Sequence, residues 1–89
     1  MLPTTVIDVA LNEALETIRS GGTDHAWVME PSEGFFLFEA EARAAALRIV
    51  QRAAERGLRA ELGTQRHGVV PCRTDGVQGF APHVRVSTA

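Results

Sequence analysis

The segment 40–56 constrains the fold of this chain more than any other part of the sequence. It contains no glycine or proline and is rich in alanine, the residue with the highest helix propensity. Gly57 follows at the position where helices commonly end in a left-handed residue. We therefore predict a helix over 40–56. Its expected core face is formed by Ala42, Ala46, Ile49, Val50 and Ala53.

A second amphipathic helix is predicted over 5–20. Apolar residues recur there at helical spacing, with a polar stripe on the opposite side. Thr5 and Asp8 resemble a capping box, and Gly21-Gly22 supplies the end of the helix. The predicted core positions are Ile7, Leu11, Ala14, Leu15 and Ile18.

The segments 26–30 and 35–38 favour a β-hairpin, because both are rich in aromatic and strand-forming residues. The intervening segment 31–34 has the proline and glycine of a turn. Strand side chains alternate between faces, so four consecutive large apolar residues cannot all point one way. Either both faces are covered within the chain, which makes these residues a core, or something outside it covers one of them. The second interpretation predicts an interaction surface of Trp27, Met29, Phe35, Phe36 and Phe38.

The C-terminal third has weaker strand patterns. Residues 58–62 alternate apolar and polar, as a half-buried strand does. Residues 69–72 indicate another strand, which Pro71 restricts to an edge or a strand end. Residues 74–76 indicate a turn. Residues 83–87 alternate again and indicate a final edge strand or a frayed tail.

These elements predict an α+β protein with a two-layer sandwich in the order α-ββ-α-β-β(-β). Two helices would pack on one face of a mixed sheet of four or five strands. The crossover from Phe38 to Leu58 is expected to be right-handed and to make its two strands parallel. At 89 residues we expect a single domain over 1–89, with 82–89 as an edge strand or frayed tail.

Charge is divided unevenly along the chain, although the formal net charge is only −2. Residues 1–41 hold eight acidic residues and one arginine, a net charge of −7. Residues 42–89 hold eight arginines and three acidic residues, a net charge of +5. In one small domain the two halves must pack together, so we expect part of this charge to be paired internally. The remainder would suit a charged partner or self-association.

The cellular setting is expected to be cytoplasmic. Cys72 is the single cysteine, which excludes an intramolecular disulfide. The sequence has no apolar run of the roughly 18–20 residues that a transmembrane helix needs. We therefore expect no membrane partner.

Functionally, the sequence favours a small non-enzymatic protein-interaction or regulatory module. It would act through the apolar hairpin face and the oppositely charged halves, with another protein or a second copy as its partner. We expect no cofactor, no metal and no catalytic residues, because no motif with recognised spacing is present.

Nucleic-acid binding is the alternative interpretation. Arg48, Arg52 and Arg56 are spaced four residues apart along the second helix, and Arg59 and Arg66 follow. Such a row could contact successive phosphates. Against it, Glu41 and Glu55 fall on the same side of the helix, and the overall charge is negative.

A small enzyme or ligand-binding domain is a third and less favoured hypothesis. It would use His67 and Cys72, with Asp75 in support, if the fold brought them into one pocket. A metal site would have to add His25 and His83, and no pair among these residues has a recognised ligand spacing.

Overall fold

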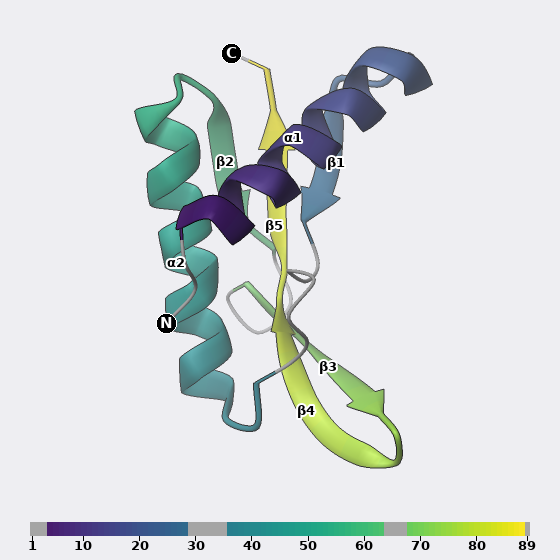
Figure 1. The fold of residues 1–89 in the computed structure, drawn as a ribbon, viewed down its shortest axis with the longest axis vertical. Helices are drawn as coiled ribbons and strands as arrows, with labels where there is room; N and C mark the ends of the chain where they lie inside the picture. The colour runs from purple at the N-terminus through teal and green to yellow at the C-terminus, as the bar shows by residue number, and fades with distance from the viewer. Residues whose placement is uncertain (1–3, 29–35, 64–67, 89) are drawn as a thin grey trace.

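The structure, a computed structural model, describes residues 4–28, 36–63 and 68–88. Figure 1 shows two helices lying across one side of a twisted layer of strands. None of the helices in these ranges is both long and apolar enough to cross a membrane. The elements are α1 (Thr4–Gly21), β1 (His25–Val28), α2 (Glu39–Glu55), β2 (Arg59–Leu62), β3 (Val69–Thr74), β4 (Val77–Pro82) and β5 (Val84–Ser87).

The predicted two-layer α+β architecture is confirmed. Helix α1 packs on β1 and β5, and α2 packs on β2 and β5 and continues onto β3 and β4. The strands form two antiparallel sheets rather than one mixed sheet, in the orders β1-β5-β2 and β3-β4. The parallel pair predicted on either side of the crossover from Phe38 to Leu58 is therefore wrong: Phe36 bridges Phe80 of β4, and β2 pairs with β5. Strands β1 and β2 run in the same direction, because both are antiparallel to β5.

Strands β4 and β5 follow one another as a long bent ribbon, with only His83 between them (Figure 1). The first half of the ribbon pairs with β3 and the second half with β1 and β2. Phe36 adds an isolated bridge to β4: its N–H donates to the Phe80 carbonyl at 2.8 Å, and the Phe80 N–H donates back at 2.7 Å.

This ribbon explains why the predicted hairpin of 26–30 with 35–38 is wrong. The two segments pair with the ribbon at different places, β1 with β5 and Phe36 with Phe80. Residue Phe38 is the N-cap of α2, not a strand residue. Pairing with β5 aligns Ala26 and Val28 with the buried Val84 and Val86, so all four bury their side chains under the helices. The turn predicted at 31–34 lies outside the described residues.

The prediction of an edge strand or frayed tail at 83–87 is also wrong. Strand β5 is the central strand of its sheet, with Val84 and Val86 fully buried. Alternation indicates that one face of a strand is covered, which is equally true of central and edge strands in a sheet with one open face. The pattern therefore located β5 but could not give its position in the sheet.

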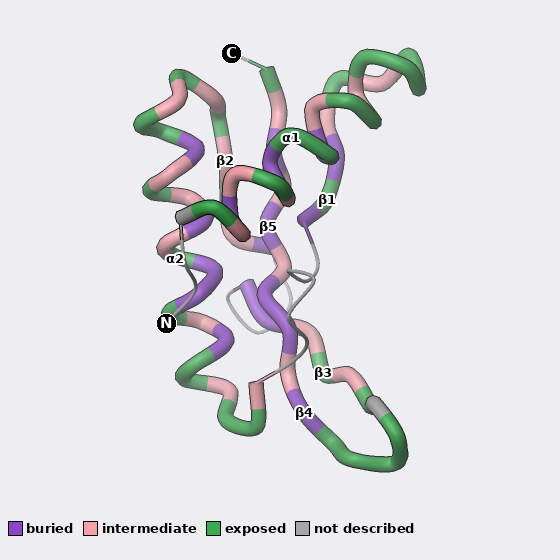
Figure 2. The backbone as a smooth tube through the Cα atoms, in the orientation of Figure 1, coloured by how far each residue is buried: buried purple, intermediate pink, exposed green. Residues whose placement is uncertain are grey.

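The hydrophobic core lies between the two helices and the β1-β5-β2 sheet. Figure 2 shows its buried segments on the inner sides of the helices and on β5. Ile7, Leu11 and Ala14 of α1 are buried as predicted, whereas Leu15 and Ile18 are only partly buried. On α2 the buried residues are Ala42, Ala45, Ala46, Ile49 and Ala53.

The predicted turn at 74–76 is confirmed and joins β3 to β4, a strand that the sequence pattern did not reveal. Thr74 pairs with Val77, leaving Asp75 and Gly76 as a two-residue loop. Both have positive φ, 52° at Asp75 and 80° at Gly76, as a type I′ hairpin turn requires. The hairpin and the Phe36 bridge extend the layer of strands beneath the N-terminal half of α2 (Figure 1).

Candidate interaction surface

The sheet β1-β5-β2 has one face covered by helices and one face, here called the open face, that no described helix covers. Burial alternates along β1 and β5, and the residues facing the helices are buried. Along β2, exposed residues alternate with partly buried ones. The side chains that point away from the helices are His25, Trp27, Arg59, Glu61, Arg85 and Ser87.

The strand register arranges the open face in two rows across the sheet. Trp27 lies opposite Arg85, which in turn lies opposite Glu61. The next row places Ser87 of the central strand between His25 and Arg59. Directly opposed residues in an antiparallel pair have Cβ atoms about 4.5–5.5 Å apart, so each row forms a continuous strip. One aromatic ring is thus set among charged and polar groups.

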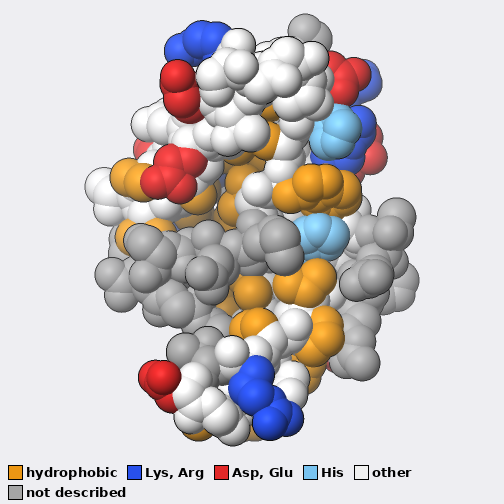
Figure 3. All heavy atoms as spheres, turned by 90° about the vertical axis from the view of Figure 1, so that its right-hand side faces the viewer, with side chains coloured by type: hydrophobic (Ala, Val, Ile, Leu, Met, Phe, Trp, Pro, Cys, Tyr) orange, Lys and Arg blue, Asp and Glu red, His pale blue; other side chains and the backbone are white. Residues whose placement is uncertain are grey.

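Trp27 is the dominant apolar group of this face and is 43% exposed. Its ring stacks on the imidazole of His83, with centroids 4.2 Å apart and planes inclined by 15°. Figure 3, which views the molecule from the β1 side, shows hydrophobic side chains gathered beside the two described histidines. An aromatic residue that is half in solvent and supported by a second ring is typical of a contact surface.

The His83 ring is held by the backbone on its other side. A Cβ atom built on Gly63 would lie 2.9 Å from both Cγ and Cε1 of His83, so any larger residue at this position would have to displace the imidazole. The Gly63 N–H donates to the His83 carbonyl at 2.8 Å, and the His83 N–H donates to the Gly68 carbonyl at 2.7 Å. Nδ1 of His83 is buried with no hydrogen-bond partner among the described residues, and this burial lowers the pKa of His83.

One corner of the open face carries a hydrogen bond between two neighbouring side chains. His25 Nδ1 lies 2.9 Å from Asp24 Oδ1, and this hydrogen bond is the main reason that the pKa of Asp24 is lowered. The charge of Arg85 lowers the same pKa further. The charges here are therefore mixed in sign, as is common around the aromatic centre of a protein-binding surface.

The aromatic residues predicted from the sequence do not lie together on one strand-borne face. Trp27 is on the open face of β1, Phe36 is partly buried against the core, and Phe38 stands at the start of α2 with 66% of its surface exposed. Met29 and Phe35 lie outside the described residues. Trp27 and Phe38 are thus two separate exposed sites, not two ends of one hairpin.

The predicted arginine row is divided by the fold. Arg52 donates from Nε and Nη2 to the two carboxylate oxygens of Asp8, at 2.9 and 3.1 Å. Arg56 contacts the same carboxylate at 3.4 Å and donates to Asn12 Oδ1 at 2.6 Å. Arg59 belongs to the open face of β2, and Arg66 lies outside the described residues. Part of the uneven charge of the sequence is therefore paired internally between the helices.

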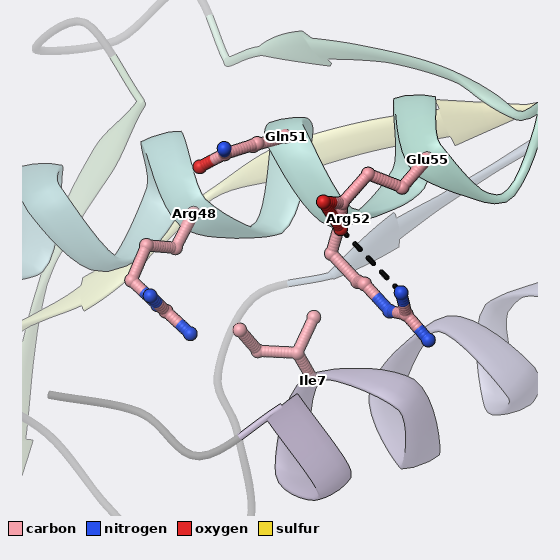
Figure 4. Close-up of a pocket in the computed structure, with 5 residues that line it drawn as sticks. All are labelled: Ile7, Arg48, Gln51, Arg52 and Glu55. Carbon is pink, nitrogen blue, oxygen red and sulfur yellow. Dashed lines mark hydrogen bonds and ion pairs between the residues drawn. The ribbon is translucent and has the colours of Figure 1, made fainter.

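A pocket of about 190 Å³ opens beside this ion pair, between α1 and α2. Figure 4 shows the side chains of Arg48 and Arg52 directed from α2 toward Ile7 of α1. Arg52 is also 3.4 Å from Glu55, so two carboxylates contact its guanidinium. The pocket is lined by Ile7, Arg48, Gln51, Arg52 and Glu55.

The residues of the enzyme hypothesis are only partly described. Cys72 lies in β3 opposite Gly79 and is partly buried, and Asp75 lies at the tip of the hairpin. His67 is outside the described residues. Within 4–28, 36–63 and 68–88, no three His, Cys, Asp or Glu side chains are grouped so that they could hold a metal ion.

The sequence indicates Trp27 for protein binding and Arg59 for the nucleic-acid alternative, but it does not indicate that the two share a face with Glu61 and Arg85. The alternation in 58–62 and 83–87 already marked Arg59, Glu61 and Arg85 as exposed positions. Their assembly beside Trp27 depends on the β1-β5-β2 strand order, which no local pattern encodes. No protein-family model, curated protein or solved structure matches the chain.

Proposed function

We propose that this protein is a small, non-enzymatic interaction module that binds a protein partner through the open face of its sheet. The observation that carries the proposal is the position of Trp27, which is 43% exposed on a face that no described helix covers. A tryptophan in the interior of a small domain would bury most of its surface. Here the ring is presented to solvent by strand β1.

The surroundings of Trp27 support protein binding. His83 stacks on the ring and fixes its orientation, so little side-chain entropy is lost when a partner covers it. Arg85 and Glu61 continue the same row and offer hydrogen-bonding groups of both signs. Surfaces with an aromatic anchor and a polar rim are the usual form of protein-binding sites.

The proposal is tested by affinity capture from cell extract with Trp27→Ser. The matched control is Val77→Ser, which changes a residue of similar exposure (48%) at the start of β4, on the other sheet. Both proteins are first checked for folding by circular dichroism. We expect at least one protein that is retained by the wild type and by the control, and lost with Trp27→Ser.

The capture experiment also has a clear contrary result. If folded Trp27→Ser retains the same proteins as the wild type, the open face is not the docking surface. If binding is lost with Val77→Ser and kept with Trp27→Ser, the contact belongs to the β3–β4 hairpin instead.

Nucleic-acid binding through the arginine row has less support. Phosphate contacts need guanidinium groups that are available, and Arg52 and Arg56 are already engaged by Asp8. A gel shift with single- and double-stranded DNA at low salt tests this alternative. Retardation that disappears with Arg59→Ala and weakens steeply with salt would favour it over protein binding.

A further inference from the structure

The outer edge of β2 carries backbone hydrogen-bonding groups that no described residue satisfies. Gly63, directly after β2, donates its N–H to the His83 carbonyl at 2.8 Å. Hydrogen-bonded and non-hydrogen-bonded pairs alternate along an antiparallel ladder, so Glu61 directs its N–H and C=O toward β5, whereas Ala60 and Leu62 direct theirs away from it. Strand β2 ends the order β1-β5-β2, and nothing in the described ranges pairs with it on the outer side.

The other strand edges are each blocked. At the edge of β1, the Thr23 hydroxyl accepts from the His25 N–H at 3.4 Å and donates to the His25 carbonyl at 3.3 Å. Counted from the hydrogen-bonded pair that closes the two-residue turn, Pro71 faces outward on β3 and has no N–H to offer. On β4, the outward-facing Phe80 is already bonded to Phe36 in both directions. Features of this kind prevent pairing with another chain, and no described residue supplies one at the outer edge of β2.

Partly buried apolar residues line the helix side of this edge. Ala60 and Leu62 of β2 and Val50 of α2 pack against the core without being fully covered. Arg48 and Arg52 point toward α1 (Figure 4), and Val50, two residues from each, lies about 200° around the helix from both. Since α1 packs on β1 and β5 and α2 packs on β2 (Figure 1), the side of α2 that carries Val50 extends over the outer edge of β2. A strand added to β2 would bury all three apolar side chains further.

The other side of the edge carries two charges of opposite sign. Arg59 and Glu61 are exposed on the open face, two positions apart, and neither has an ion pair with a described residue. Antiparallel pairing is the more stable kind, and it places directly opposed side chains close enough for opposite charges to attract. An acidic residue therefore fits opposite Arg59 and a basic residue opposite Glu61. An antiparallel partner runs from Leu62 toward Arg59, so its order is apolar, basic, apolar, acidic.

We infer that the outer edge of β2 binds an extended segment of another protein as an additional antiparallel strand with this order of side chains. The segment pairs its backbone with Ala60 and Leu62, places its apolar residues beside Val50, and continues the open face with its charged residues. In strand addition, main-chain hydrogen bonds give affinity and alternate side chains give specificity. The inference does not rest on the proposed function, because Trp27 is on β1 at the opposite edge of the sheet.

A second copy of this chain fits the edge less well than a free segment. Pairing of two β2 strands about a two-fold axis would bring both α2 helices to the same side of the sheet, over the same two strands. Neighbouring strands are about 4.8 Å apart, whereas packed helix axes need about 8–10 Å. An extended segment carries no such helix.

Hydrogen exchange in the free protein, measured by NMR, tests whether the edge is open. The amide of Glu61, which faces β5, should be protected. Those of Ala60 and Leu62 should exchange at least about tenfold faster after correction for intrinsic rates. Equal protection of the three amides would show that the edge is already paired and would overturn the inference.

The bound segment is tested by selecting from random octapeptides displayed on phage against the immobilised full chain. Enriched peptides should have the order apolar, basic, apolar, acidic, and synthetic copies should bind with a Kd of about 1–100 µM in fluorescence anisotropy. N-methylation of the two apolar residues removes the N–H groups that face β2 and should weaken binding at least about tenfold. N-methylation of the two charged residues is the matched control and should leave the affinity unchanged. A selection that enriches no peptide, or peptides without this alternation, contradicts the inference.

Two protein variants locate the peptide on β2. Ala60→Pro removes an outward N–H without removing a bond between β2 and β5, and should weaken binding at least about tenfold. Gln78→Pro is the matched control, since Gln78 also faces outward, on β4, and should not change the affinity. Arg59→Glu leaves the backbone intact, and a repeated selection should replace the acidic residue opposite it with a basic one. Circular dichroism shows whether each variant is folded.

The remaining outcomes separate this inference from its alternatives. Trp27→Ser should leave the peptide affinity unchanged, whatever becomes of the proposed function. Loss of the peptide with Trp27→Ser, or unchanged affinity with folded Ala60→Pro, would place the peptide elsewhere. A dimer of the free chain that Ala60→Pro dissociates, seen by sedimentation equilibrium, would assign the edge to a second copy and refute the peptide as its occupant.

Discussion

Arg52 holds Asp8 through two parallel hydrogen bonds, with Nε 2.9 Å from Oδ1 and Nη2 3.1 Å from Oδ2, and this pair ties α2 to α1. Arg56 contacts the same carboxylate at 3.4 Å. The hydrogen bond from Arg52 is the largest cause that lowers the pKa of Asp8, and the same bond raises the pKa of Arg52. The negative and positive parts of the sequence therefore meet at this point.

Asp8→Asn is expected to lower the urea midpoint of unfolding at neutral pH. Since the folded-state pKa of Asp8 lies below its usual 3.8, its contribution is complete above that pH and is lost as pH falls through the folded value. The difference between wild type and variant should therefore shrink on acidification. Glu13→Gln, at an exposed position on the same helix, is the control and should have little effect. A difference that stays constant down to the lowest pH would contradict the ion pair.

Gly63→Ala is expected to destabilise the fold by about 1–3 kcal/mol, the usual cost of overpacking. The new methyl group would collide with the His83 ring and push it against Trp27. Gly21→Ala is the matched control, because a Cβ there would meet Thr23 at an ordinary 3.7 Å. Urea unfolding followed by Trp27 fluorescence gives the midpoint of unfolding of both variants. Equal midpoints for the two variants would show that Gly63 does not support His83.

Protonation of His83 is expected to reduce stability below about pH 6.5. Burial lowers the pKa of His83 in the folded state, whereas the unfolded chain binds its proton near the ordinary value of 6.5. Below that value the unfolded state takes up more protons, so the free energy of unfolding falls as pH falls. His83→Phe keeps an aromatic ring against Trp27 and should remove this part of the dependence. His25→Gln should retain it, and the opposite pattern would contradict the assignment.

Gly76→Ala should cost about 1–2 kcal/mol, since the residue has a φ of 80° that alanine adopts only with strain. Gly76→Asn should cost less, because asparagine tolerates the left-handed region. In thermal unfolding of the three proteins, the midpoint temperature should be highest with glycine, lower with asparagine and lowest with alanine. If alanine were as stable as glycine, the two-residue turn would be excluded.

Both helices could be predicted from the sequence because their signals are local. For each helix, the spacing of apolar residues, the helix propensity and the glycine at its end lie within one continuous segment. The observed bounds of α1 and α2 differ from the predicted ones by one residue at each end. The exposure of Leu47 on the outer side of α2 could not be predicted, because seven alanines in 40–56 satisfy both an inner and an outer face.

The strand pairing could not be predicted, because it depends on contacts distant in sequence. Residues 77–82 contain a glycine and a proline and show no alternation, so β4 was missed even though Asp75-Gly76 precedes it. Without β4 the long ribbon cannot be predicted, and the sequence favours pairing the nearby segments 26–30 and 35–38 with each other instead. The open face around Trp27 was hidden for the same reason.

Acrylamide quenching of Trp27 fluorescence shows whether the open face is accessible to solvent, since the chain has one tryptophan and no tyrosine. Since 43% of the surface of Trp27 is exposed, acrylamide should quench the fluorescence of the native protein readily. The quenching constant should be lower than that of the chain unfolded in urea. The quenching should fall when a captured partner is added. Native fluorescence that acrylamide scarcely quenches, with the emission of an indole buried in an apolar interior, would show that the open face is covered and that Trp27 is not a docking residue.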